Sequence, residues 1–183
     1  MRGFTGRIAA RTALSAMLAL GVGALAAVPA SAAEGTSCAS DVGTAKVSPG
    51  LTGVAKVQTI TIKGTLGGCT GPTGATGKYV IHLKTSAPAT CLSLETSGGA
   101  AQGTAVIKWG KGHGNSLGSL SISGSPESGL ALAASITAGP FAGLGVATTI
   151  TGEPVFTGIG FPCTQQNPLK QLNLTGTSPF VIS

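Results

Sequence analysis

The stretch 104-TAVIKWGKGHGNSLGSLSIS-123 decides between two fold classes, because its centre has two opposite interpretations. Gly112 to Gly118 follows the pattern G-x-G-x-x-x-G directly after a strand-like run, which is close to the loop of a dinucleotide site. Such a site needs a helix directly after the glycines, whose N-terminus meets the pyrophosphate. Residues 119–123 instead alternate serine with leucine or isoleucine, which predicts a strand and argues against a cofactor at this loop.

The same stretch therefore predicts a β-hairpin. Its turn, residues 110–115, holds three glycines and an asparagine, which accept the positive φ angles of tight turns. Trp109 has the same parity as Ala105 and Ile107, so we expect it to pack in the core and not to form an exposed platform for sugar rings. Three residues at the exposed tip form a candidate contact loop for a partner: Lys111, His113 and Asn115.

Period-two alternation recurs along the rest of the chain. The segment 78-KYVIHLKT-85 places Tyr79, Ile81 and Leu83 on one face and its basic side chains on the other. Glycine, proline and serine clusters separate the expected strands, which cover 54–66, 78–85, 90–96, 104–108, 117–123, 130–137, 145–151, 172–175 and 180–182. About eight to ten short strands predict an all-β fold, either an antiparallel β-sandwich or a barrel.

The N-terminus has the three parts of a secretory signal peptide. Three arginines precede an apolar run over 13–28, and small residues end it at 29–33. The apolar run is shorter than the roughly 20 residues that span a bilayer, so we expect cleavage after Ala32 or Ala33 and no membrane span afterwards. We therefore divide the chain into a signal peptide, 1–32, and a single secreted, extracellular β-domain, 33–183, of a length that fits one core.

All four cysteines lie after the predicted signal peptide. An even number of cysteines in an exported protein predicts two disulfides, and three pairings remain open from the sequence. We favour Cys38 with Cys69 and Cys91 with Cys163, because each first partner lies in an early strand and its mate lies beyond a return segment. No C-x-x-C occurs and neither histidine has a cysteine at ligand spacing, so we expect no metal.

The charge of the secreted part is modest. The formal net charge of +6 includes the three arginines of the signal peptide, and eight lysines and five acidic residues follow it. The lysines are scattered singly between Lys46 and Lys170, whereas nucleic-acid binders usually cluster lysine with arginine. We therefore expect no nucleic-acid partner, and the high isoelectric point by itself identifies no other partner.

The order of the landmarks resembles a group of small secreted actinobacterial proteins with four cysteines, mostly uncharacterised. The resemblance covers essentially the whole secreted part, and its motifs are strand-and-turn features. It implies a disulfide-bonded β-sandwich and carries over no catalytic or binding residue. The matching features are Cys38, 48-SPGLT-52, 60-ITIKGTLGGC-69, Cys91, 103-GTAVIKW-109, 136-ITAGPFAG-143 and Cys163.

Catalytic signals are weak. Asp41 is the only aspartate that could complete a Ser-His-Asp triad with His82 or His113, and no G-x-S-x-G elbow occurs. The five acidic residues stand alone, so nothing in their spacing predicts the paired carboxylates of a glycosidase or the cage of a calcium site. We expect neither an enzyme nor a cofactor.

What remains by elimination is a secreted structural or surface-interaction protein. Strand faces rich in threonine and serine suit contact with a cell-wall polymer or another protein. An alternative is a carrier of a small apolar ligand between sheets, which draws on the many alanines and glycines of the later strands. A secreted hydrolase is the least favoured interpretation.

Overall fold

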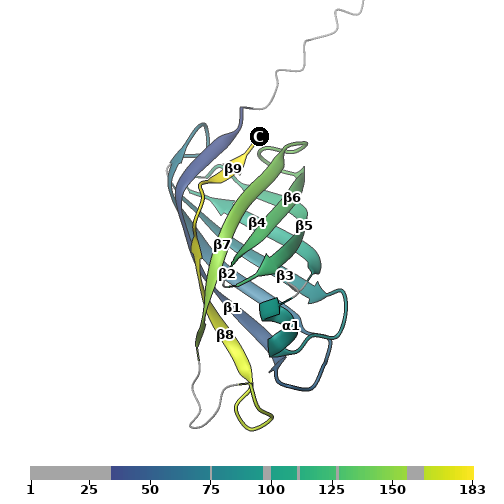
Figure 1. Cartoon of the computed structure of the whole chain (residues 1–183). Helices are drawn as coiled ribbons and strands as arrows, with labels where there is room; N and C mark the ends of the chain where they lie inside the picture. The colour runs from purple at the N-terminus through teal and green to yellow at the C-terminus, as the bar shows by residue number, and fades with distance from the viewer. Residues whose placement is uncertain (1–33, 75, 97–99, 111, 127, 156–162) are drawn as a thin grey trace, which may run out of the picture. The chain divides into compact units, whose positions relative to one another are not determined.

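The computed structural model describes residues 34–74, 76–96, 100–110, 112–126, 128–155 and 163–183 (Figure 1). The chain divides into two units, Met1–Ser31 and Ala32–Ser183, and every described residue belongs to the second. The predicted signal peptide, 1–32, and its cleavage site lie outside the described residues. So does Lys111 of the candidate contact loop.

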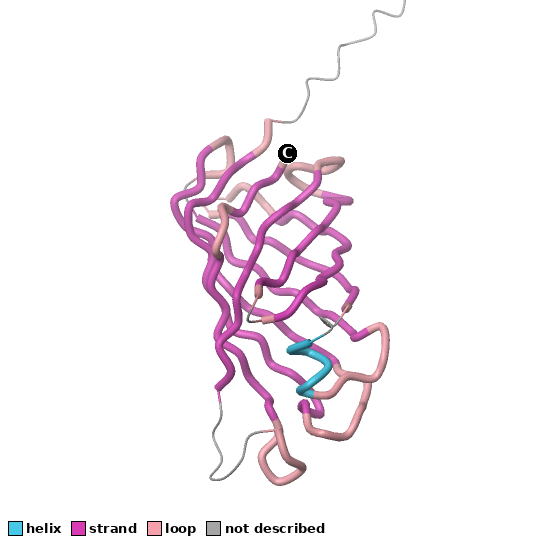
Figure 2. Tube along the Cα trace, in the orientation of Figure 1, coloured by secondary structure: helices cyan, strands magenta, loops and turns pink. Residues whose placement is uncertain are grey.

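Most of the described chain is β-strand (Figure 2). The elements are β1 (Thr36–Leu51), β2 (Thr59–Thr70), β3 (Thr76–Thr85), α1 (Cys91–Thr96), β4 (Ala101–Trp109), β5 (Asn115–Ser125), β6 (Gly129–Ala138), β7 (Gly145–Val155), β8 (Leu169–Gly176) and β9 (Phe180–Ile182). The prediction of an antiparallel all-β fold is confirmed.

The first eight strands close into an antiparallel barrel. Each strand pairs with the next along the chain, and β1 pairs with both β2 and β8, so the ring has no free edge. The pairing of β1 with β8, which closes the barrel, runs from Val42 opposite Thr175 to Lys46 opposite Gln171. The short β9 pairs with β1 and β7 at one end of the barrel, whereas α1 lies toward the other end (Figures 1 and 2).

Side chains point alternately into and out of the barrel along each strand, and the inward ones fill its interior. In β3 the predicted pattern is confirmed, because Tyr79, Ile81 and Leu83 are buried while the basic side chains of the strand are exposed. The other strands of the ring alternate in a similar way, less regularly in β1 and β8, and supply further core residues, among them Ile62, Leu120, Leu132, Ile150, Leu172 and Leu174. The barrel interior is therefore a packed apolar core.

The predicted hairpin is present between β4 and β5. Lys108 pairs with Asn115, and the Trp109 N–H donates to the carbonyl of Gly114 at 3.1 Å. Gly112 and Gly114 have φ angles of 80° and 81°, a region that glycine enters without steric cost. The glycines of this stretch thus serve a turn between two strands.

Trp109 is a core residue, as its parity predicts. Its side chain is 3% exposed, and its indole Nε1–H donates to Ser116 Oγ at 2.8 Å. That hydroxyl in turn donates to the carbonyl of Pro140 at 2.6 Å, in the turn after β6. The ring of Phe141 meets the indole edge-on, with 5.4 Å between centroids. Trp109 therefore joins two hairpins at one end of the barrel.

One predicted strand is wrong, because 90–96 contains the helix α1. Thr90 and Ser93 explain the change, since their side chains cap the helix reciprocally. The Ser93 N–H donates to Thr90 Oγ1 at 3.0 Å, and the Thr90 N–H donates to Ser93 Oγ at 2.8 Å. This exchange follows the logic of a capping box, with serine where glutamate is usual.

The longest strand, β1, was not among the expected strands. Its first half, 36-TSCASD-41, is polar and shows no clean alternation, and Pro49 and Gly50 are typical turn residues. The strand exists because it pairs with a neighbour on each side. With β2 it keeps one register from Cys38 opposite Cys69 to Ser48 opposite Thr59, in which only Ala39 of β1 is unpaired, and on its other side it pairs with β8. Pairing on both sides outweighs weak local propensity.

The two disulfides have the pairing that we favoured. Cys38 bonds to Cys69, its direct register partner across β1 and β2. Cys91 at the start of α1 bonds to Cys163, ahead of β8. Two such bonds are consistent with an oxidising compartment.

Candidate functional site

The outward side of β1 to β4 carries a concentration of positive charge. Its basic side chains are exposed and come from all four strands, and we call this surface the lysine face: Lys46, Lys63, Lys78, His82, Lys84 and Lys108. The one acidic residue in these four strands, Asp41, is buried on the opposite side of the sheet. Within these four strands, no outward carboxylate neutralises the lysine face.

The strand register makes these separate lysines neighbours. Lys78 lies directly opposite Lys108, a like-charged pair that weakens a sheet. Lys63 lies opposite Val80, which puts it diagonally next to Lys78. Lys46 lies opposite Thr61, which puts it diagonally next to Lys63 in the same way. The lysines are scattered in sequence but contiguous in space.

Hydroxyl groups and shallow depressions lie between the lysines. Thr61 Oγ1 and His82 Nδ1 are 3.4 Å apart on neighbouring strands. A depression of about 460 Å³ is lined by Val42, Gly43, Thr44, Lys63, Gly64, Thr65 and Lys78. A second one, of about 290 Å³, is lined by Thr44, Lys46, Ser48, Thr59, Thr61 and Lys63. The surface thus offers ammonium and hydroxyl donors around open grooves.

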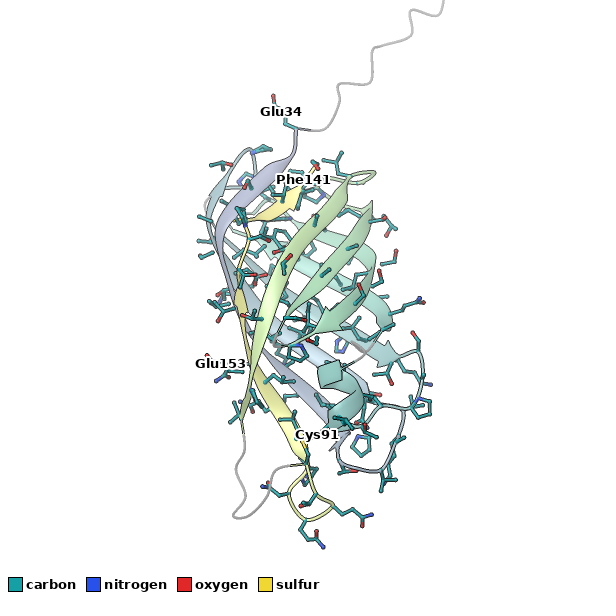
Figure 3. All side chains as sticks on the ribbon, viewed as in Figure 1. Glu34, Cys91, Phe141 and Glu153 are labelled. Carbon is teal, nitrogen blue, oxygen red and sulfur yellow. A yellow bond between two sulfur atoms is a disulfide. The ribbon has the colours of Figure 1, made fainter. Side chains whose placement is uncertain are left out.

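The exposed acidic side chains of the described residues lie elsewhere. Figure 3 shows Glu34 at the end of the barrel, just before β1, and Glu153 on β7. Glu153 is in register with Asn173 of β8, outside the four strands of the lysine face. Asn173 is also the register partner of Thr44 in β1, so Glu153 lies two strands from the edge of the lysine face.

The outer surface of β5 and β6, next to the lysine face, is uncharged. An open groove of about 630 Å³ crosses it, lined mainly by small side chains: Gln102, Gly103, Thr104, Ser119, Leu120, Ser121, Ala133, Ala134 and Ser135. The lysine face therefore ends at β4, and an uncharged, hydroxyl-rich surface with a shallow groove follows it.

The candidate contact loop borders the lysine face. His113 and Asn115 are exposed, and Asn115 is the register partner of Lys108. Lys111 lies outside the described residues. The lysine face itself was missed, because alternation gives the outward residues of one strand but not the strand beside it. The pattern of 78–85 was the one available signal, since it put two lysines and His82 on a common face.

Inside the barrel, Asp41 and Tyr79 form a buried polar pair. The Tyr79 hydroxyl donates to Asp41 Oδ1 at 2.5 Å, and both side chains are largely shielded from solvent. The tyrosine ring lies over Gly64, where an added Cβ would come within 2.3 Å of the ring atom Cζ. Burial raises the pKa of Asp41, and the hydrogen bond from Tyr79 offsets this rise in part. Burial and the neighbouring carboxylate raise the pKa of Tyr79.

Two small cavities remain in the interior. One of about 30 Å³ lies beside Asp41, Tyr79 and Ser116, and its other walls are mostly apolar. The other, of about 50 Å³, lies beside Gln58 and Thr85. Cavities of this size hold a water molecule or two, whereas ligand sites measure roughly 300–1,000 Å³.

We expect Asp41→Asn to remove a pH-dependent loss of stability. Because the pKa of Asp41 is raised above its ordinary value of 3.8, the folded protein holds this proton more tightly than the unfolded chain does. The resulting stability is complete below pH 3.8 and is lost as the pH rises through the raised pKa, by at most about 1.4 kcal/mol per pH unit. Asparagine stays neutral and can still accept the Tyr79 hydroxyl.

Denaturant unfolding between pH 3.5 and 8 measures this effect. The expected difference between Asp41→Asn and wild type grows with pH from about pH 4 and becomes constant once the pH has passed the raised pKa of Asp41. Tyr79→Phe is the matched variant, since it keeps the ring and removes the donor that favours the carboxylate. It should raise the pKa of Asp41 further and so extend the loss of stability to higher pH. Parallel pH profiles for Asp41→Asn and wild type would contradict the prediction.

Comparison with protein-family models, with curated proteins and with solved structures finds no match. In the part of the chain that the structure describes, no helix is long and apolar enough to cross a membrane. The described histidine, cysteine and acidic side chains form no group of three or more that could hold a metal ion. The site therefore has to be interpreted from its own chemistry.

Proposed function

We propose that this protein is a secreted surface-interaction protein that binds an anionic polymer of the cell wall through its lysine face. The observation that carries the proposal is the gathering of five lysines from four adjacent strands on one outward surface without an outward acidic residue. A surface of one sign attracts ligands of the other sign and raises their local concentration.

The repulsion between neighbouring lysines of the face supports a binding role. Lys78 and Lys108 repel each other directly across the sheet, and a bound anion between them removes that repulsion. Lysine supplies strongly hydrated point charges on flexible stems, which suit a mobile polymer better than a rigid bidentate contact. The threonines between the lysines add hydroxyl donors and acceptors for sugar or polyol groups.

The disulfides and the predicted signal peptide support binding outside the cytoplasm. Two disulfides are consistent with an oxidising compartment, and the N-terminal pattern predicts export. Anionic polymers of the cell wall are ligands of the right charge in that compartment.

The alternative role as a carrier of a small apolar ligand has less support. The interior cavities of about 30 and 50 Å³ are several times smaller than typical ligand sites. An apolar ligand would have to displace packed core side chains such as Leu120 and Leu132. The outer surface is therefore the better candidate for binding.

Co-sedimentation with purified cell-wall sacculi tests the proposal. At low salt we expect wild type to be retained, and a variant with all five lysines of the face changed to glutamine to lose at least about tenfold in retention. Retention should fall at high salt, because exposed charges are screened. The control is Lys56→Gln with Lys170→Gln, which removes two exposed lysines outside the face. Equal retention of the five-lysine variant and wild type would contradict the proposal. Retention that does not change with salt would indicate a protein or a neutral ligand instead.

A further inference from the structure

We propose that four lysines of the face form a diagonal track, which binds one linear polyanion lengthwise across β4, β3, β2 and β1. In order, the track is Lys108, Lys78, Lys63 and Lys46. The inference rests on the proposed function and adds the shape and minimum length of the ligand.

The register defines the track step by step. From Lys108 the next lysine, Lys78, is directly opposite on β3. From Lys78 the track moves one strand over and two residues along to Lys63, and then makes the same move to Lys46. Directly opposite residues are about 5 Å apart and diagonal ones about 7–8 Å, so the four lysines span roughly 20 Å in one direction.

The depressions of the surface follow the same line. The depression of about 460 Å³ lies between Lys78 and Lys63, and the one of about 290 Å³ lies between Lys63 and Lys46. The backbone of Gly43 and Gly64 forms part of the wall of the first depression. Charge and open space therefore alternate along the track, as a polymer with an anionic group on each repeat requires.

Lys84 lies on the same face but off the track. It is on β3, six residues beyond Lys78, which corresponds to about 20 Å along the strand. Its register partners are Thr59 and Gln102, and no track lysine is opposite or diagonal to it. Lys84 therefore adds to the charge of the lysine face without lying on the track, which makes it the comparison for position along the track.

The geometry selects a class of ligand. A single small anion can contact one or two of these lysines, whereas a linear chain of at least four anionic repeats contacts all of them. Each added contact is then intramolecular and strengthens binding through effective concentration. The shared chemistry is a linear chain with one phosphate or carboxylate per repeat.

Titration with defined polyanions tests the track. The probes are orthophosphate, tripolyphosphate, a long linear polyphosphate and oligogalacturonate, the last to separate phosphate from carboxylate recognition. We expect orthophosphate to bind far more weakly than the long chains. Lys63→Gln, in the middle of the track, should weaken binding of the long chain at least about fivefold and lower the slope of log affinity against log salt by about one.

Lys56→Gln, at an exposed lysine outside the face, should change the affinity by less than about twofold. Lys84→Gln, on the face but off the track, should weaken binding less than Lys63→Gln does if the ligand follows the track. Equal losses for Lys63→Gln and Lys84→Gln would overturn the track and leave the proposed function standing, because the face would then act through its total charge. Failure of wild type to bind either long polyanion would overturn both. Preference for polyphosphate or for oligogalacturonate, with the Lys63 effect retained, supports the track and identifies the anionic group.

Discussion

Replacing Trp109 with alanine is expected to destabilise the protein by about 3–5 kcal/mol, as for other buried tryptophans. The indole is 3% exposed, and the truncation removes its packing, its edge contact with Phe141 and its hydrogen bond to Ser116. These contacts join the β4–β5 hairpin to the turn after β6, so their loss loosens one end of the barrel. A change of this size is a large part of the stability of a single domain.

Trp109→Phe separates the parts of this effect. Phenylalanine keeps most of the apolar contact but cannot donate to Ser116, so we expect a loss of about 1–2 kcal/mol. Because Trp109 is the only tryptophan, unfolding in urea has to be followed by circular dichroism in both variants. Val54→Ala, at a side chain that is 45% exposed, is the control and should stay within about 0.5 kcal/mol of wild type. A loss below about 1 kcal/mol for Trp109→Ala would contradict the assignment of this residue to the core.

Removing the disulfide between Cys91 and Cys163 is the second large change. The bond closes a loop with a sequence separation of 72, which contains β4 to β7. In the chain-entropy model a loop of that length contributes about 4 kcal/mol by restricting the unfolded chain. The six-residue helix α1 is also far shorter than helices that are stable alone, so we expect its position to depend on this bond.

The double variant Cys91→Ala with Cys163→Ala measures this contribution by urea unfolding followed through Trp109 fluorescence. The matched variant, Cys38→Ala with Cys69→Ala, opens a loop with a sequence separation of 31 and should lose slightly less. Wild type in reducing buffer should lose more than either variant. If the Cys91 and Cys163 variant unfolds at the same urea concentration as wild type, the bond does not stabilise the fold.

The fold class could be predicted from the sequence because its signals are local. Alternation in 78–85 and 117–123 depends on neighbouring residues alone, and so does the choice between a turn and a helix after Gly118. The burial of Trp109 followed from the same parity. These predictions are confirmed by the register and burial of β3, β4 and β5.

The errors came where a local capping signal was not recognised or where distant partners override local preference. The helix α1 replaces an expected strand because Thr90 and Ser93 cap each other and Cys91 is held by a disulfide. The strand β1 forms from a polar segment because β2 and β8 pair with it on both sides. Neither partner of β1 can be identified from the composition of β1 itself.

The lysine face shows most sharply what depended on the tertiary structure. The sequence alone determined that Lys63, Lys78 and Lys108 each point outward from their strands, since side chains alternate along a strand. Only the closed sheet decided that these lysines lie side by side on the outer surface and that Asp41 lies inside against Tyr79. The physical reason is that register and strand order are set by packing between segments distant in the chain, and a slip of one residue would turn each lysine into the core.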